Sequence, residues 1–194
     1  MPDAIILAIA AATLGAIIGS FLNALSFRFN TGRGVVWARS TSLRASRSRC
    51  MHCGHALSPL DLVPIFSFLF LRGRCRYCEA RISLQYPLVE GVAAILGFIV
   101  YLTHPEPLAF VFWLLVWMTL LFVVVYDLRH QIIPWSCSIF LIVLALVYLL
   151  AGHHTNLVGV VAGPLLAAPL LLISAVSRGR WMGWGDGVLQ LSLG

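Results

Sequence analysis

Long apolar runs constrain this chain more than any other feature of its sequence. A helix needs about 20 apolar residues to cross the hydrocarbon core of a bilayer, and five segments approach or reach that length: 4–27, 86–103, 108–126, 136–151 and 157–176. Across the chain 60% of the residues are hydrophobic and 10% are charged, against about 45–50% and about 25% in soluble domains. These figures exclude a soluble domain, a disordered chain and a disulfide-rich secreted scaffold. They predict an all-α polytopic membrane protein.

The first apolar segment could instead be a signal peptide. It is preceded by Asp3 rather than by a positive residue, and it lacks an obvious small-residue cleavage site. Both observations favour a membrane span.

The arginines predict the orientation of the chain in the membrane. All 13 basic residues are arginine. Ten lie between Arg28 and Arg81, Arg129 follows the third apolar segment, and Arg178 and Arg180 follow the fifth. Because basic residues are enriched in cytoplasmic loops, this distribution predicts an external N-terminus and a cytoplasmic side that carries every arginine. Membrane lipids with anionic headgroups are the partners expected for them; an arginine-rich loop could also bind nucleic acid, which we do not expect here.

The same pattern divides the chain into three parts. Residues 1–27 form a first transmembrane helix, residues 28–85 form a cytoplasmic insert, and residues 86–194 form the remaining transmembrane bundle. The insert is long enough for a small module but too short for a large core of its own.

Four cysteines in the insert form two C-x-x-C pairs, Cys50 with Cys53 and Cys75 with Cys78. Two such turns are the usual way to supply four thiolates to a tetrahedral zinc ion, and a site filled by four sulfurs is typically structural. The competing interpretation is two disulfides or a redox pair, which a reducing cytoplasm disfavours. The sequence therefore predicts a structural zinc site.

Other possible ligands are interpreted more simply. His52 and His55 could add to the metal site but are expected to be exposed loop residues, and Cys137 is expected to be a small apolar side chain within the fourth span. Among the acids of this region, Asp61 is expected to be solvated or locally paired, and Glu90 to cap the second span or to face the interior of the bundle.

Asp127 and Asp186 differ from the other acids because each follows an apolar segment on the same predicted side of the membrane. A carboxylate at a hydrocarbon boundary is costly and by default suggests a functional site. Two carboxylates that share a site repel each other, so that one proton is held between them, and such a pair can activate water and protonate a carbonyl. The alternative is that Asp127 pairs with Arg129 or His130 and that Asp186 caps a helix beginning near Val188.

In the first span, Gly15 and Gly19 stand four residues apart, a spacing that favours close helix packing. Asn23 follows one turn later. It is expected either to form a backbone hydrogen bond or to lie near a docked substrate helix.

Several motifs occur in an order that is typical of one family. They are Gly19-Ser20-Phe21-Leu22-Asn23 with Arg28, the two cysteine pairs, Pro64, Leu71-Arg72-Gly73-Arg74-Cys75, Ile82-Ser83-Leu84-Gln85-Tyr86-Pro87-Leu88-Val89-Glu90, Asp127 with Ile133-Pro134, and Gly183-Trp184-Gly185-Asp186. This ordered set resembles the type IV prepilin peptidases, the bacterial leader peptidases and N-methyltransferases that belong to the GxGD-type aspartic peptidases.

The resemblance implies that Asp127 and Asp186 are a catalytic pair in an enzyme of the bacterial inner membrane. It implies prepilin or pseudopilin substrates of type IV pilus or type II secretion systems. It also implies methylation of the new N-terminal amine from S-adenosylmethionine, although no glycine-rich cofactor loop is visible. Gly183 and Gly185 become candidate substrate-binding residues, because glycine lets a substrate strand approach the backbone.

Three features depart from the family pattern. Val188 stands where the family usually has lysine, Trp135 stands where a polar residue often follows Ile-Pro, and further spans are usual beyond the position of Gly194. We therefore expect a bundle that is incomplete at its C-terminal end. The alternative function is that of a catalytically inactive, truncated or degenerate paralogue that serves as a membrane assembly or scaffold protein.

Overall fold

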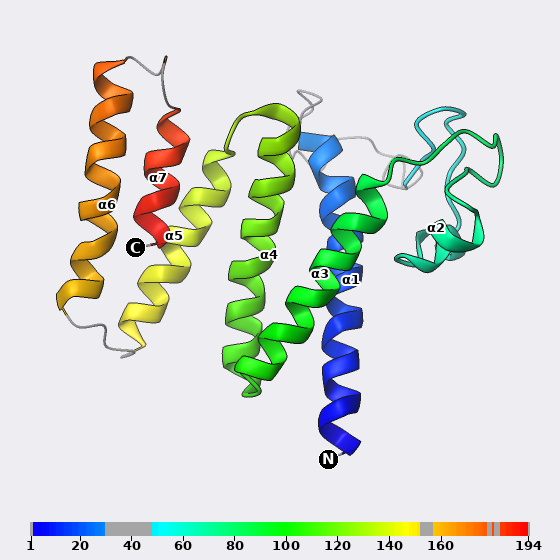
Figure 1. Ribbon diagram of the computed structural model, residues 1–194, viewed down its shortest axis with the longest axis horizontal. Helices are drawn as coiled ribbons and strands as arrows, with labels where there is room; N and C mark the ends of the chain where they lie inside the picture. The colour runs from blue at the N-terminus through cyan, green and yellow to red at the C-terminus, as the bar shows by residue number, and fades with distance from the viewer. Residues whose placement is uncertain (1, 30–47, 152–156, 178–179, 181–182, 194) are drawn as a thin grey trace, which may run out of the picture. The chain divides into compact units, whose positions relative to one another are not determined.

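The computed structural model describes residues 2–29, 48–151, 157–177, 180 and 183–193 (Figure 1). Within these ranges the chain is helical apart from turns and two isolated β-bridges, so the predicted all-α fold is confirmed. The elements are α1 (Pro2–Phe29), η2 (Pro59–Leu62), α2 (Phe66–Phe70), α3 (Gln85–Thr103), α4 (Pro107–His130), α5 (Trp135–Leu150), α6 (Leu157–Val176) and α7 (Trp184–Leu193). They fall into two compact units, Met1–Val125 and Tyr126–Gly194.

Three helices are long and apolar enough to cross a membrane: α1 over Asp3–Ser26, α3 and α4. This confirms a multi-pass membrane protein. Helix α5 has 16 residues and therefore extends about 24 Å, and the portion Val161–Val176 of α6 is similarly short. The fourth and fifth spans thus remain predictions, although their helices begin and end close to the predicted limits.

Helices α1 and α3 pack side by side and antiparallel in the first unit (Figure 1). Their glycines allow this contact: a Cβ on Gly15 would collide with the carbonyl oxygen of Ala93, and a Cβ on Gly19 would lie 2.7 Å from the Cβ of Ala93. Gly97 of α3 returns the contact, because its added Cβ would lie 2.5 Å from the carbonyl oxygen of Ala11. The close packing predicted from Gly15 and Gly19 is confirmed.

Asn23 joins the same two helices by a polar contact. Its side chain is fully buried, and Nδ2 donates a hydrogen bond to the carbonyl oxygen of Tyr86 at 3.2 Å. Ser26, also fully buried, donates to the carbonyl oxygen of Asn23 at 2.8 Å. The backbone hydrogen bond expected for Asn23 is therefore present. It fixes the α1–α3 register at the end of α3 that adjoins the insert.

In the second unit, α7 packs against both α5 and α6. Pro164 and Pro169 lie inside α6, where an apolar environment tolerates proline better than water does. Helix α7 has 10 residues, about 15 Å, which is too short to span a bilayer. Five arginines that contribute to the predicted orientation lie outside the described residues: Arg33, Arg39, Arg44, Arg47 and Arg178.

Candidate active site and metal centre

Each cysteine pair lies in a tight turn, and the two turns have the same hydrogen-bond pattern. In the first, Cys50 N donates to His55 O and Gly54 N donates to Cys50 O, both at 2.9 Å. In the second, Cys75 N donates to Ala80 O and Glu79 N donates to Cys75 O, again at 2.9 Å. Isolated β-bridges, Arg49 with Ala56 and Arg74 with Arg81, close the two turns. The equivalence of the two turns is typical of a paired-knuckle metal module.

The four sulfurs meet although the two turns are separated in the sequence. The Sγ atoms of Cys50, Cys53, Cys75 and Cys78 all lie within 4.8 Å of one another, and those of Cys50 and Cys78 are 3.8 Å apart. All four cysteines are free thiols. A tetrahedral Zn–S₄ site with bonds of about 2.3 Å has sulfur–sulfur separations of about 3.8 Å. The donor set and its spacing therefore fit a metal ion, and a disulfide arrangement is not formed.

Electrostatics also favour a cation among these sulfurs. The backbone N–H groups of Cys53 and His52 lower the pKa of Cys50 to about 6. At Cys78 the Ala80 N–H acts in the same direction, but desolvation and hydrogen bonds with the neighbouring thiols outweigh it and raise the pKa to about 12. One thiolate thus forms readily while a second is opposed, and a bound cation would remove that opposition.

The predicted spare ligands remain outside the cluster. His52 and His55 are exposed, and the His55 ring stacks on Tyr77 with ring centroids 3.7 Å apart. Neither histidine belongs to the group of four ligands, as expected for loop residues. Cys137 is half-buried in α5.

Asp61 ties η2 to the second cysteine turn. Its carboxylate accepts hydrogen bonds from the Ser58 hydroxyl at 2.8 Å and from the Ser58 N–H at 3.0 Å. It also accepts one from Tyr77 at 3.3 Å and pairs with Arg76 at 3.1 Å. Burial opposes ionisation, but the Ser58 donors, Arg76 and Tyr77 together hold the pKa of Asp61 below its ordinary value. Asp61 is therefore locally paired, as predicted.

Glu90 connects α3 to the insert. Its side chain is 6% exposed, and Oε2 accepts a hydrogen bond from the Ile65 N–H at 2.7 Å. Ile65 has φ 62° and ψ −50°, and Phe66 N donates to Pro64 O at 2.6 Å. This is a classic γ-turn, which is rare and strained, especially at a β-branched residue. Glu90 thus faces the interior, and it holds a strained turn of the insert against α3.

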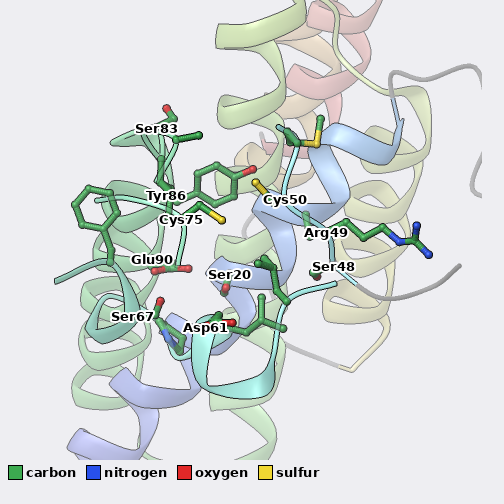
Figure 2. Close-up of a pocket in the computed structure, with 18 of the residues that line it drawn as sticks. Ser20, Ser48, Arg49, Cys50, Asp61, Ser67, Cys75, Ser83, Tyr86 and Glu90 are labelled. Carbon is green, nitrogen blue, oxygen red and sulfur yellow. The ribbon is translucent and has the colours of Figure 1, made fainter. Parts of the chain in front are cut away.

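A cavity of about 740 Å³ opens between this turn, α1, α3 and the first cysteine turn, entirely within the first unit. Ser20, Asp61, Ser67, Tyr86 and Glu90 supply polar groups to its wall (Figure 2). The remainder of its lining is largely apolar. Sequence reasoning did not find this cavity, because its walls come from four separate segments.

The two candidate catalytic aspartates both belong to the second unit. Asp127 is exposed in the last turn of α4, and Asp186 is half-buried in the first turn of α7. Helix α7 begins at Trp184, not near Val188, so the predicted cap at Asp186 was wrong. The residues around Asp186 form the first helical turn, because the Asp186 N–H bonds to Gly183 O at 3.3 Å.

Backbone packing connects the segments that follow and precede these aspartates. A Cβ on Gly185 would lie 2.9 Å from the Cβ of Ile133, six residues after Asp127. A Cβ on Gly187 would lie 2.5 Å from Leu171 Cδ2 in α6. The space beside these two glycines is thus occupied by the protein's own side chains. At Gly183, by contrast, an added Cβ would meet nothing closer than Asp186 Oδ2 at 3.5 Å.

Ser174 supports the same loop from α6. It is fully buried, and its hydroxyl donates to the carbonyl oxygen of Gly183 at 3.3 Å. Sequence reasoning missed this residue. The available signal was a hydroxyl in the last turn of an apolar helix, nine residues before Gly183.

Two family models together cover most of the chain. Residues 13–104 match the bacterial Peptidase A24 N-terminal domain, and residues 110–194 match the type IV leader peptidase family. The first match contains the insert and the α1–α3 pair, and the second contains both aspartates. No solved structure matches the chain.

Curated relatives agree with these matches, and each is described as a prepilin leader peptidase/N-methyltransferase. The protein of Aeromonas hydrophila is 32% identical over 199 residues, which cover 92% of this chain and 69% of the relative. That of Stutzerimonas stutzeri is 32% identical over 205 residues, covering 95% and 71%. That of Dichelobacter nodosus is 33% identical over 150 residues, covering 75% of this chain and about half, 52%, of the relative. The chain therefore belongs to the type IV prepilin leader peptidase family.

Proposed function

We propose that this protein is a membrane aspartic endopeptidase that cleaves the leader of type IV prepilins or pseudopilins at the cytoplasmic membrane boundary. Asp127 and Asp186 act as the catalytic pair. The observation that carries the proposal is the contact between Gly185 and Ile133, because it joins the segment that follows Asp127 to the residue that precedes Asp186. The relatives' description as prepilin leader peptidases supports the same substrate class.

Peptide hydrolysis by such a pair needs no covalent intermediate. The ionised aspartate takes a proton from water, whose oxygen attacks the carbonyl carbon of the leader bond, while the protonated aspartate donates its proton to the carbonyl oxygen. Collapse of the tetrahedral intermediate breaks the C–N bond, leaving a carboxylate on the leader and an amine on the pilin. Because both carboxylates lie at helix ends, the reaction is expected where a cytoplasmic leader meets an apolar pilin helix.

The orientation follows from the arginines. With the N-terminus outside the bacterial inner membrane, the insert and both aspartates face the cytoplasm. We assign residues 1–27, 28–85 and 86–194 to a first transmembrane helix, a cytoplasmic insert and the peptidase bundle. Gly183, which has free space beside its backbone, is the stronger substrate-binding candidate of the two glycines before Asp186.

Zinc is the metal proposed for the four cysteines, in a structural role. All its ligands are sulfur, so no position remains for water or substrate, and its contribution is to hold the two turns of the insert together. The relatives' names also include N-methyltransferase activity. We extend this activity to the present chain, with S-adenosylmethionine as the donor of the methyl group that the new N-terminal amine would accept.

The test of the peptidase is leader cleavage in membranes that contain a prepilin and one variant of this chain. We expect Asp127→Asn and Asp186→Asn each to abolish cleavage while the amount of membrane-inserted protein stays unchanged. Asp3→Asn is the matched control, since it removes an exposed carboxylate at the opposite end of α1 and should cleave normally. Full cleavage by either of the first two variants would refute the assignment.

A further inference from the structure

The cavity beside the insert has the size and lining of a small-molecule site. Its volume of about 740 Å³ lies within the range of about 300–1,000 Å³ typical of ligand pockets, which combine apolar walls with a few polar groups. It is built from α1, α3 and the insert, so it belongs to the first unit, whereas Asp127 and Asp186 belong to the second. The peptidase chemistry proposed above does not use it.

Glu90 is the distinctive group in the wall. It is a carboxylate that is 6% exposed at the end of an apolar helix, and Oε2 accepts a hydrogen bond from Ile65 N–H. Across the described part of the chain, the ion pair in the insert is that of Arg76 with Asp61, and no cation pairs with Glu90. Figure 2 shows the Arg49 side chain directed away from the Glu90 carboxyl group. A buried carboxylate without a positive partner is costly, so a ligand that brings a positive charge would be stabilised here.

The carboxylate is also held in a fixed orientation. The Ile65 N–H that binds it belongs to the strained γ-turn at Pro64–Phe66, and strained backbone persists where the surrounding structure fixes it, often at binding sites. Ser20 and Ser67 lie near the same carboxyl group (Figure 2). A positioned charge with hydroxyls beside it, in an otherwise apolar cavity, suits an organic cation better than a hydrated metal ion.

We propose that this cavity binds an organic cation whose positively charged centre, a sulfonium or an ammonium group, lies against Glu90. The inference deepens the proposed N-methyl transfer, in which the methyl donor is a sulfonium and the acceptor is the new N-terminal amine. Both ligands present the same chemistry to the carboxylate. The cavity is accordingly the site of methyl transfer, separate from the pair of aspartates.

Binding to the full chain in detergent micelles, measured by isothermal titration calorimetry, tests the site. The sulfonium arm compares S-adenosylmethionine with its neutral product, S-adenosylhomocysteine. The ammonium arm compares a short apolar peptide that has a free N-terminal amine with the same peptide acetylated. We expect saturable binding in at least one arm and at least fivefold weaker binding of its neutral counterpart. The arm that binds identifies which cation the cavity takes.

Two variants assign the binding to Glu90. Glu90→Gln removes the charge but keeps an oxygen for the Ile65 N–H, and it should weaken binding at least tenfold. Glu106→Gln is the matched control, because Glu106 is exposed in the turn before α4, and it should bind as the parent does. Ser67→Phe, which fills part of the cavity and leaves the carboxylate in place, should also weaken binding. No binding in either arm, or equal affinity in Glu90→Gln and the parent, would overturn the proposal.

Two further measurements on the same preparations separate this proposal from the others. Metal content and thermal unfolding show whether Glu90→Gln is folded. Leader cleavage reports on Asp127 and Asp186, so loss of cleavage in Asp127→Asn with normal cation binding would show that the two sites act independently. Absent cleavage by the parent with intact cation binding would refute the peptidase alone.

Discussion

Gly185 packs directly against Ile133, so closely that a Cβ on the glycine would lie 2.9 Å from the Cβ of the isoleucine. Contacts this short require one of the two segments to move. Because Ile133 follows Asp127 by six residues and Gly185 adjoins Asp186, the movement would change the separation of the candidate catalytic carboxylates. The glycines of the loop are therefore expected to differ in their tolerance of a methyl group.

We predict that Gly185→Ala reduces leader cleavage at least tenfold, since a displacement of about 1 Å at a catalytic group can cost about a hundredfold in rate. Gly183→Ala should retain cleavage on steric grounds, because its Cβ would contact Asp186 Oδ2 at an ordinary 3.5 Å. Rates of cleavage by equal amounts of inserted protein make the comparison. If Gly183→Ala is as impaired as Gly185→Ala while the fold is intact, the free space at Gly183 is needed by substrate rather than by the loop.

The α1–α3 pair gives a prediction about stability. Gly15→Ala would force a Cβ onto the carbonyl oxygen of Ala93, a backbone atom that cannot rotate away. We expect a loss of about 2 kcal/mol or more in unfolding free energy, within the range of overpacking effects. Gly91→Ala in α3 is the matched control, because no atom lies within 4 Å of its added Cβ. Denaturant titration in micelles provides the measurement, and equal stability of the two variants would contradict the packing.

The four cysteines make a prediction about metal content. Purified protein should contain about one zinc ion per chain, and Cys50→Ser or Cys78→Ser should lose most of it, since each removes one of four ligands. Cys137→Ser should keep the metal, because Cys137 lies in α5, outside the cluster. Metal analysis by mass spectrometry is the measurement. Retention of zinc by both ligand variants would exclude the proposed site.

Asp61 leads to a pH-dependent prediction. Its pKa is held below its ordinary value by Ser58, Arg76 and Tyr77 in opposition to burial, so its contribution to stability is complete above the unfolded pKa of about 4. That contribution is lost as pH falls through the lower folded value. Asp61→Asn should therefore destabilise the insert at pH 7 by about 1–3 kcal/mol, and its difference from the parent should shrink below about pH 4.

Hydrogen exchange in the insert measures this difference, and comparison with the parent at each pH removes the effect of metal release, which both proteins share. Arg76→Gln should produce a smaller loss, because the arginine side chain is half exposed and solvent screens the pair. A difference between Asp61→Asn and the parent that does not change with pH would show that the carboxylate charge is not what stabilises the turn.

Sequence alone predicted the helices well, because hydropathy reports directly on burial in lipid. Gly15, Gly19 and Asn23 were also interpretable, since small and polar residues in an apolar helix have few roles. The meeting of four sulfurs was likewise predictable, because the spacing of each cysteine pair is local and a shared metal links the two pairs.

Other contacts were not predictable because they depend on tertiary geometry. Nothing in the sequence around Ile65 indicates a γ-turn, and a buried acid 25 residues later determines its N–H partner. Helix α7 begins before Asp186 rather than after it because Gly185 and Gly187 dock on Ile133 and Leu171, and packing outweighs the low helix propensity of glycine. The cavity requires segments from four parts of the chain.

The pairing of α1 with α3 also has a consequence for the order of events during synthesis. Residues 30–84 separate the two helices, so α1 enters the membrane well before its partner exists, and at about 5–20 residues per second the interval is several seconds. During that interval the faces at Gly15 and Asn23 have no α3 to contact. A metal that joins Cys50 to Cys78 would shorten the segment still to be closed, which reduces its entropic cost. Metal supply during translation would thereby influence how quickly the first helical hairpin of this protein assembles.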